Sequence, residues 1–470
     1  MEYEEGIENE NGGYLNVSLF SAFQELQHLN LSYGLFDGWM ENEGFERLVG
    51  LRKLEVLDLS YNFFNDNILP SLAALTTLRT LSLAGNSLEG SFHLEGFERL
   101  TGLKKLEVLD LSSNFFNNSV LPSLATLKSL KILSLSFNIL KGSSHFEELF
   151  ALNKLQSLDL SLNSLNASSG QFQGFQKLVG LRKLEVLDLS YNSFNNSILP
   201  SLAALKSLRV LSLSNNNFQG FSHFQELFTS NKLQSLDLSY NSFNFSLGQF
   251  QDLCQLKHLQ ELRLRGNDFE GILPPCLQNL TTLRVLDLLD LSNNRFKGNI
   301  HSSLISSLTS LVSISLSYND FDGLFSFITF ANHSNLESID LSSAGHKLKV
   351  ETEFPSWASP FQLKVLQLSN SNLNATIPRF LTTQHNLIEI DLSSNNLTGM
   401  FPTWLLENNK MLKVLILKNN SLGGHFVLSN IHRAAYIMDI SNNDFNGLLQ
   451  ENIGEMLPNL GSLNLFPKLF

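Results

Sequence analysis

The feature of this chain that most constrains its fold is a leucine motif repeated along almost its entire length. The motif L-x-x-L-x-L-x-x-N recurs in segments such as LEVLDLSYN at 54–62, LRTLSLAGN at 78–86 and LKVLILKNN at 412–420. About eighteen copies follow one another with a mean spacing near 25 residues. One copy is too short to bury its own apolar face. Successive copies must therefore stack and share a core.

Each copy contains the pattern of a short strand that ends in a turn. In the first clear copy Leu57 and Leu59 alternate with Asp58 and Ser60, so the leucines face inward and the polar residues outward. The final Asn is predicted to bond backbone groups at the turn, and these asparagines form a buried ladder along the stack. In the copy at 184–192 we expect Asn192 to be such a buried residue and Asn196 to be exposed.

A Phe or Leu two residues after the Asn predicts an apolar spine behind the sheet, which accounts for many of the 37 phenylalanines. These patterns predict an α/β leucine-rich-repeat solenoid. We expect a right-handed horseshoe or superhelix with a parallel β-sheet on its concave side and short helical or irregular convex segments. Residues 1–25 read as an acidic N-terminal segment and poor cap, and 26–470 as one solenoid whose last repeat is incomplete.

One segment departs from the regular spacing. LRVLDLLDLSNN at 283–294 carries three extra residues. Either Leu286, Leu289 and Leu291 or Leu283, Leu286 and Leu288 face inward, and the pattern leaves both registers open.

Charge and motif content exclude several classes of function. The net charge of −12 argues against a nucleic-acid surface. The sequence has no metalloprotease, serine-hydrolase, P-loop or kinase signature, so we expect a protein that is not an enzyme and uses no cofactor or metal. It has neither a secretory signal peptide at its start nor an apolar run long enough for a transmembrane helix.

Longer segments resemble one family. LCQLKHLQELRLRGNDFEGILPPCLQNLTTLRVLDL, VETEFPSWASPFQLKVLQL and FPTWLLENNKMLKVLILKNNSL are similar to the ectodomains of plant leucine-rich-repeat receptor-like proteins. The resemblance implies an extracellular solenoid at the plasma membrane that recognises a protein, peptide or glycan. It implies defence or developmental signalling through partner receptor kinases. It also implies that this chain is an ectodomain portion truncated at both ends.

Two other interpretations stay open at this point. The same repeats occur in secreted enzyme inhibitors, although that type is shorter and closed by Cys-bearing caps. They also occur in intracellular scaffolds that bind other proteins. Glycan occupancy on the plant-expressed protein distinguishes the scaffold from the other two.

Candidate ligand-binding residues are those that depart from the uniform outward-facing column or place an aromatic ring beside it. Arg263 and Arg265 replace the usual Asp and Ser, and Ile416 and Lys418 do so in a later copy. The alternative for the arginines is a cross-strand ion pair with Asp237 or Asp290. The predicted site on the concave face comprises Arg263, Arg265, Tyr240, Asp237, Tyr191, Tyr318 and Lys418. The alternative for the tyrosines is lateral packing along the sheet edge.

Two further kinds of site belong to a secreted protein. Cys254 and Cys276 lie about one repeat apart, and the resemblance implies a disulfide; the alternative is two buried thiols. N-x-S/T sequons place candidate glycosylation sites at Asn117, Asn166, Asn195, Asn244, Asn279, Asn332, Asn374 and Asn396.

Overall fold

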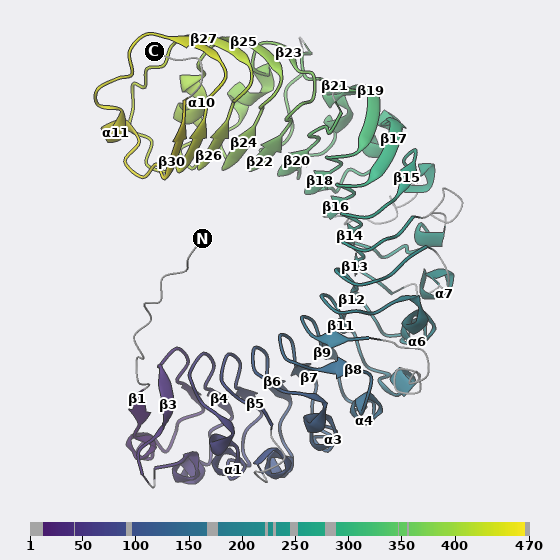
Figure 1. The fold of residues 1–470 in the computed structure, drawn as a ribbon, viewed down its shortest axis with the longest axis vertical. Helices are drawn as coiled ribbons and strands as arrows, with labels where there is room; N and C mark the ends of the chain where they lie inside the picture. The colour runs from purple at the N-terminus through teal and green to yellow at the C-terminus, as the bar shows by residue number, and fades with distance from the viewer. Residues whose placement is uncertain are drawn as a thin grey trace. The chain divides into compact units, whose positions relative to one another are not determined.

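Each repeat folds as one turn of a solenoid, with a short strand on one side and a helical or irregular segment on the other. A computed structural model describes residues 13–41, 43–90, 96–166, 177–220, 224–228, 232–244, 252–277, 288–345, 347–354 and 357–465. The chain divides into two compact units, Met1–Leu233 and Gln234–Phe470. Within each unit the strands line the inner side of the curve and the short helices lie on its outer side (Figure 1).

The first unit contains a parallel sheet of three-residue strands paired in chain order. Its strands are β2 (His28–Asn30), β4 (Val56–Asp58), β5 (Thr80–Ser82), β6 (Val108–Asp110), β7 (Ile132–Ser134), β9 (Ser157–Asp159), β11 (Val186–Asp188) and β12 (Val210–Ser212). Equivalent residues of successive turns stand opposite one another, as Asp58 does to Ser82 and Ser82 to Asp110. The register that the motif predicts is therefore the observed one.

The strands of the second unit are likewise short, parallel and paired in chain order. Its strands are β13 (Ser235–Asp237), β14 (Glu261–Arg263), β16 (Leu288–Asp290), β18 (Ser313–Ser315), β20 (Ser338–Asp340), β22 (Val365–Gln367), β24 (Glu389–Asp391), β26 (Val414–Ile416), β28 (Ile437–Asp439) and β30 (Ser462–Asn464). The irregular segment adopts the register in which Leu289 and Leu291 are fully buried and Asp290 faces outward opposite Arg263.

Additional strands, from two to seven residues long, follow the turn in many repeats and pair along the flank of each unit. In the first unit these are β1 (Gly13–Leu15) with β3 (Phe36–Trp39), and β8 (Lys141–Gly142) with β10 (Ser164–Leu165). In the second unit β15 (Glu270–Gly271), β17 (Arg295–Asn299), β19 (Asp320–Ser326) and β21 (Leu348–Glu351) pair in sequence. The same holds for β23 (Asn374–Ala375), β25 (Asn396–Met400), β27 (Ser421–His425) and β29 (Asp444–Asn446).

The convex segments are one-turn helices, several of which begin with proline at a position that needs no donor. The α-helices are α1 (Leu69–Leu72), α2 (Gly96–Arg99), α3 (Leu121–Leu124), α4 (Phe146–Leu149), α6 (Leu199–Ala203), α7 (Phe224–Phe228), α9 (Ser302–Ser306), α10 (Thr403–Asn408) and α11 (Ile453–Met456). The 3-10 turns are η1 (Val17–Phe20), η2 (Phe45–Gly50), η3 (Asp66–Ile68), η4 (Leu100–Gly102), η5 (Asn118–Val120), η6 (Lys177–Gly180), η7 (Asn196–Ile198), η9 (Phe327–Phe330) and η10 (Arg379–Thr383).

The core between these layers has the predicted composition. The strand leucines and the phenylalanine spine are buried, and neighbouring spine rings stack with centroids 6.2 Å apart for Phe243 and Phe269 and 6.0 Å for Phe269 and Phe296.

The predicted asparagine ladder is present. At Asn192 the amide nitrogen donates to the carbonyls of Leu160, Leu189 and Ser190, and its oxygen accepts from the Leu165 amide. Asn192 itself is half-buried rather than buried, whereas Asn62 and Asn86 at the same repeat position are buried as expected. The bonding of the ladder is thus uniform although its burial varies from turn to turn.

Candidate functional site

The outward-facing Asp column has a structural role in the strands that carry it. Asp58 accepts a hydrogen bond from the backbone amide of Ser60, two residues later, and Asp110 accepts one from Ser112. The same bond recurs in both units from Asp159 to Asp439. Asn30 makes it as well, with the Ser32 amide. The Asp-x-Ser pattern therefore caps its own strand through one carboxylate oxygen. The second oxygen accepts from the Ser134 hydroxyl in Asp159 and from the Ser315 hydroxyl in Asp340.

Strand β14 departs from this pattern because Arg263 and Arg265 stand where Asp and Ser normally do. Arg263 lies between Asp237 of β13 and Asp290 of β16 in register. Its guanidinium, however, pairs with Glu261 on its own strand at 3.1 Å, and Glu261 also accepts a hydrogen bond from Ser235 at 2.9 Å. The cross-strand partners that the sequence suggested for Arg263 are thus not the observed ones.

Arg265 is exposed and differs from Arg263 in its partner. Its guanidinium carbon lies 5.8 Å from the centroid of the Tyr240 ring, at cation–π distance. None of the ion pairs among the described residues involves Arg265. The Arg265 guanidinium therefore keeps its planar row of donors available, and that geometry suits a carboxylate.

The predicted site residues fall into one cluster and several separate positions. Asp237, Tyr240, Arg263 and Arg265 lie together on β13, β14 and the turns that follow these strands. Tyr318 follows β18, two strands from β14, and Lys418 follows β26, farther along the second unit. Tyr191 belongs to the first unit. Sequence reasoning missed Glu261, although its unusual charge at a column of Val and Ser was visible.

The aromatic residues before the ladder Asn occupy a distinctive backbone conformation. Tyr61, Tyr191, Tyr240 and Tyr318 have φ between 51° and 54°, the left-handed region that bulky residues rarely adopt. Each is about half exposed. The Tyr240 ring also lies over Gly266 of the next turn, where an added Cβ would come within 2.7 Å of it. Lateral packing and exposure thus occur in the same residue.

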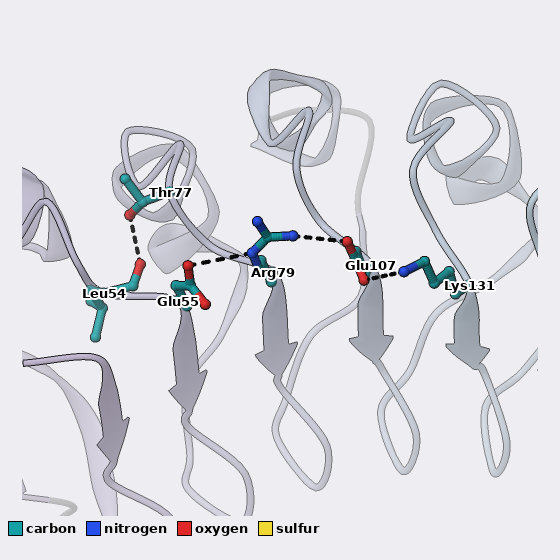
Figure 2. Close-up of polar contacts among 6 residues, drawn as sticks. All are labelled: Leu54, Glu55, Thr77, Arg79, Glu107 and Lys131. Carbon is teal, nitrogen blue, oxygen red and sulfur yellow. Dashed lines mark hydrogen bonds and ion pairs between the residues drawn. The ribbon is translucent and has the colours of Figure 1, made fainter.

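A second row of charges lies at the start of the strands, and the leucine motif does not predict it. In the first unit the residues Glu55, Arg79, Glu107 and Lys131 alternate in sign on successive turns (Figure 2). Arg79 pairs with Glu55 at 3.4 Å and with Glu107 at 2.9 Å, and Lys131 pairs with Glu107. The hydrogen bond from Lys131 lowers the pKa of Glu107 below its ordinary value. Thr77 adds a hydrogen bond to the Leu54 carbonyl beside this row (Figure 2).

The cysteines and most sequons lie on the outer parts of the turns. Cys254 and Cys276 form a disulfide with Cα atoms 6.0 Å apart. Asn117, Asn195, Asn244, Asn332 and Asn396 are exposed, and Asn166 is half-buried. Asn279 lies outside the described residues, and for Asn374 only the backbone, in β23, is described.

Two kinds of feature are absent from the described part of the chain. Across these residues no group of three or more His, Cys, Asp or Glu side chains is placed to hold a metal ion. No helix in the same residues is long and apolar enough to span a membrane.

Comparison with known proteins agrees with the repeat pattern and the fold. The Leucine Rich Repeat family model matches residues 53–75, 105–127, 183–205, 207–227, 232–256, 258–280 and 386–408. Together with the stacked strands, this match defines the chain as a leucine-rich-repeat solenoid protein.

Similarity to individual proteins identifies the family more closely. Receptor-like protein 1 of Arabidopsis thaliana is 39% identical over 96% of this chain and 41% of its own length. Cuscuta receptor 1 of Solanum lycopersicum is 32% identical over 97% of this chain and 45% of its own length. The crystal structure of PEPR1–AtPEP1 is 25% identical, with a TM-score of 0.55 over 94% of this chain and 69% of that one. The chain belongs with the plant leucine-rich-repeat receptor-like proteins, and it spans less than half the length of these two curated relatives.

Proposed function

We propose that this chain is the ligand-recognition part of a plant receptor-like protein and works without catalysis. Its relatives are named as receptors, and the PEPR1–AtPEP1 structure has the same fold. By the same resemblance we propose that it acts on the extracellular side of the plasma membrane. There it would bind a protein or peptide and signal with a receptor-kinase partner.

The observation that supports a specific site is the Arg263 and Arg265 pair on β14. A sheet face that repeats one pattern cannot discriminate among ligands, whereas a local change in charge can. Arg265 offers guanidinium donors beside the Tyr240 ring, and Asp237 and Asp290 flank the same strand. This arrangement suits a ligand that presents a carboxylate next to an apolar or basic group.

The test uses a display library of decapeptides with free carboxyl termini, selected on the full chain. We expect the enriched peptides to bind about tenfold more weakly to Arg263→Ala/Arg265→Ala, the scale of a hot-spot truncation. They should also weaken when their terminal carboxyl is amidated.

Arg295→Ala is the matched control, because Arg295 is an exposed arginine paired with Asp268 on the flank of the sheet. Its affinity for the enriched peptides should equal that of the parent. Melting temperatures should stay close in all variants, since exposed ion pairs contribute little to stability. Unchanged affinity in the double variant would remove this site from the proposal.

A further inference from the structure

From β4 to β9 of the first unit, the column of outward-facing positions that contains Asp58 carries negative charge and no positive charge. Asp58, Asp110 and Asp159 lie on β4, β6 and β9, with Ser82 and Ser134 on the strands between them. The ion pairs of the described residues include none of these three aspartates. The nearby cations Arg79 and Lys131 are held by Glu55 and Glu107 at the strand starts (Figure 2).

An apolar edge borders this acidic face on the side where the strands end. It consists of Tyr61, Phe63, Phe115, Phe137, Ile139 and Leu162, whose exposed fractions lie between 43% and 61%. Backbone hydrogen bonds join the edge to neighbouring turns, for example from Ile139 to the Phe116 carbonyl and from Phe137 to the Ser161 carbonyl. The edge residues therefore lie on the turns after β4, β6, β7 and β9, whereas the turn after β5 has Gly85 and Ser87 at the equivalent positions.

Three of these residues sit where the backbone disfavours them. Tyr61, Phe137 and Leu162 have φ of 54°, 51° and 52°. The equivalent positions on other turns are filled in part by Gly85 and Asn215, which tolerate that conformation better, and in part by Tyr191, Tyr240 and Tyr318. Tyr61 stacks on Tyr33 of the preceding turn, with ring centroids 4.5 Å apart. Phe137 and Leu162, in contrast, keep 61% and 43% of their surfaces exposed at an unfavourable φ. This suggests that a partner covers them.

The charge pattern excludes a second copy of the chain as that partner. Two copies meeting through the same face would bring acidic rows together, and the whole chain carries a net charge of −12. A partner with positive charge is complementary to the face, and it must also present apolar groups to the edge.

The spacing of the aspartates indicates the backbone conformation of the partner. Strands two apart in a sheet are about 9.4–9.8 Å apart. A polyproline II helix repeats every three residues, about 9.3 Å. A β-strand repeats its faces at about 6.7 Å, and an α-helix at about 5.4 Å per turn. Polyproline II segments also dock on aromatic-lined surfaces, as the edge is.

We propose that the first unit binds a proline-rich peptide in the polyproline II conformation with Lys or Arg at every third position. The basic side chains pair with the carboxylates of Asp58, Asp110 and Asp159, of which Asp159 also accepts a hydrogen bond from the Ser134 hydroxyl at 3.4 Å. The prolines pack on the apolar edge. This surface is separate from the Arg263 and Arg265 cluster and does not depend on it.

The probe is a fluorescent peptide of five Lys-Pro-Pro repeats, titrated into the full chain at low salt and followed by anisotropy. Two comparators have the same charge: five Lys-Gly-Ser repeats, and a peptide of the probe's composition with all its lysines at one end. We expect the probe to bind at least tenfold more tightly than either comparator. Equal binding of the three peptides would reduce the interaction to charge attraction and overturn the proposal.

The decisive variant is Asp58→Asn/Asp110→Asn/Asp159→Asn. Asparagine preserves the strand cap, as Asn30 shows with the Ser32 amide, so this variant is expected to fold. The variant should lose the tenfold preference for the probe over the two comparator peptides. The matched control is Asp340→Asn/Asp391→Asn/Asp439→Asn, which changes the same cap in the second unit. This control should keep the tenfold preference for the probe. Retained preference in the first triple variant would overturn the proposal.

Two further variants and one hydrodynamic measurement test whether the probe binds at this surface. Phe137→Asn/Leu162→Asn removes part of the apolar edge with a residue that tolerates positive φ, and should weaken the probe at least fivefold. Arg263→Ala/Arg265→Ala should leave probe binding unchanged, so failure here is distinguishable from failure of the proposed receptor site. Sedimentation shows whether the full chain forms a dimer. A dimer that is lost in Asp58→Asn/Asp110→Asn/Asp159→Asn would show that a second copy of the chain covers this face, and would overturn the proposal.

Discussion

At the scale of single residues, the ladder asparagine determines how one turn joins the next. The Asn192 amide closes its own turn through Leu189 and Ser190, and reaches the preceding turn through Leu160 and Leu165. No other side chain of similar size supplies both donors and an acceptor in this arrangement. A fixed spacing of Asn along the sequence is therefore a direct consequence of backbone groups that each turn leaves without partners.

Replacing Asn192 by Leu should destabilise the protein by about 1–3 kcal/mol, because buried carbonyls and an amide lose their partner. Thermal unfolding followed by circular dichroism measures the change. Asn217→Ala is the control, since Asn217 is exposed on the neighbouring turn, and its melting temperature should match the parent. Equal losses in the two variants would contradict the ladder interpretation.

Asn196 shows where residue-level prediction fails. The sequence predicts an exposed side chain, but Asn196 is half-buried and pairs with the backbone of Gln219 in the next turn at 3.0 Å. Asn118 makes the equivalent pair with Lys141, and Asp66 accepts from Glu89 and Gly90. These three residues sit at one repeat position, but the partner is a backbone group 23 residues away, which periodicity alone does not reveal. The prediction for Asn196 is therefore wrong.

At the scale of elements, side chains just before the strand link successive turns of the second unit. His333, Gln384 and Asn409 occupy equivalent positions, three residues before Leu336, Leu387 and Leu412. Gln384 accepts from the Leu363 amide, and Asn409 accepts from the Leu387 amide. His333 is fully buried and its Nε2 lies 3.1 Å from the Ile305 carbonyl, while its Nδ1 has no partner. Because a carbonyl only accepts, neutral His333 carries its proton on Nε2.

This column predicts a pH dependence of stability. Burial lowers the pKa of His333 below its ordinary value of 6.5, against the opposing effect of backbone hydrogen bonds. The unfolded chain therefore binds a proton at His333 more readily than the folded protein does. Stability should be constant well above pH 6.5 and fall as the pH drops below it, by up to about 1.4 kcal/mol per pH unit for one group.

Urea unfolding between pH 5 and 7.5 measures this slope, and His333→Gln should reduce it. Glutamine is the residue that Gln384 provides at the same position, so the variant is expected to fold. Burial also lowers the pKa of His432, which contributes separately. The stability of His333→Gln/His432→Gln should therefore depend on pH even less than that of the single variant. An unchanged slope in both variants would show that the acid sensitivity arises elsewhere.

Whether a strand, a row of side chains or an ion pair could be predicted from the sequence depends on whether the feature repeats. Strands, spine and ladder follow from a pattern that recurs on nearly every turn. The charge row of Glu55, Arg79, Glu107 and Lys131 also recurs, and reading that single column would have found it. The Arg263 pair with Glu261 was not predictable in the same way. Three acidic residues surround Arg263, and side-chain packing alone selects among them.

At the scale of the whole molecule, the two faces described here separate two kinds of recognition. The cluster on β13 and β14 concentrates positive charge within an acidic column. The face from β4 to β9 carries aspartates on alternate strands, with serines between them, and is bordered by apolar side chains. A chain of uniform repeats thus offers chemically distinct surfaces because only the outward positions vary, while the inward leucines stay fixed. The sequence therefore predicts the core with much more certainty than the ligand.

The outer turns bear on where the molecule resides. Asn117 and Asn195 are exposed, and each accepts a hydrogen bond from the backbone amide of the sequon Ser two residues later. That bond uses the side-chain oxygen and not the amide nitrogen, which is the atom that receives a glycan. Asn65 forms the same turn with the Asn67 amide but lacks the required Ser or Thr.

If the chain passes through the secretory pathway, Asn117 and Asn195 should carry N-glycans and Asn65 should not. Ser197→Ala should remove the glycan at Asn195, and Asn67→Ser should create a new one at Asn65, each visible as a one-glycan mass change. Peptide mapping by mass spectrometry, on protein expressed in plant cells with a secretion signal, measures both. Because the two substitutions act on the same turn in different repeats, the gain and the loss control one another. A glycan at neither Asn117 nor Asn195, with Asn65 also unmodified after Asn67→Ser, would mean that this turn is closed to the modifying enzyme.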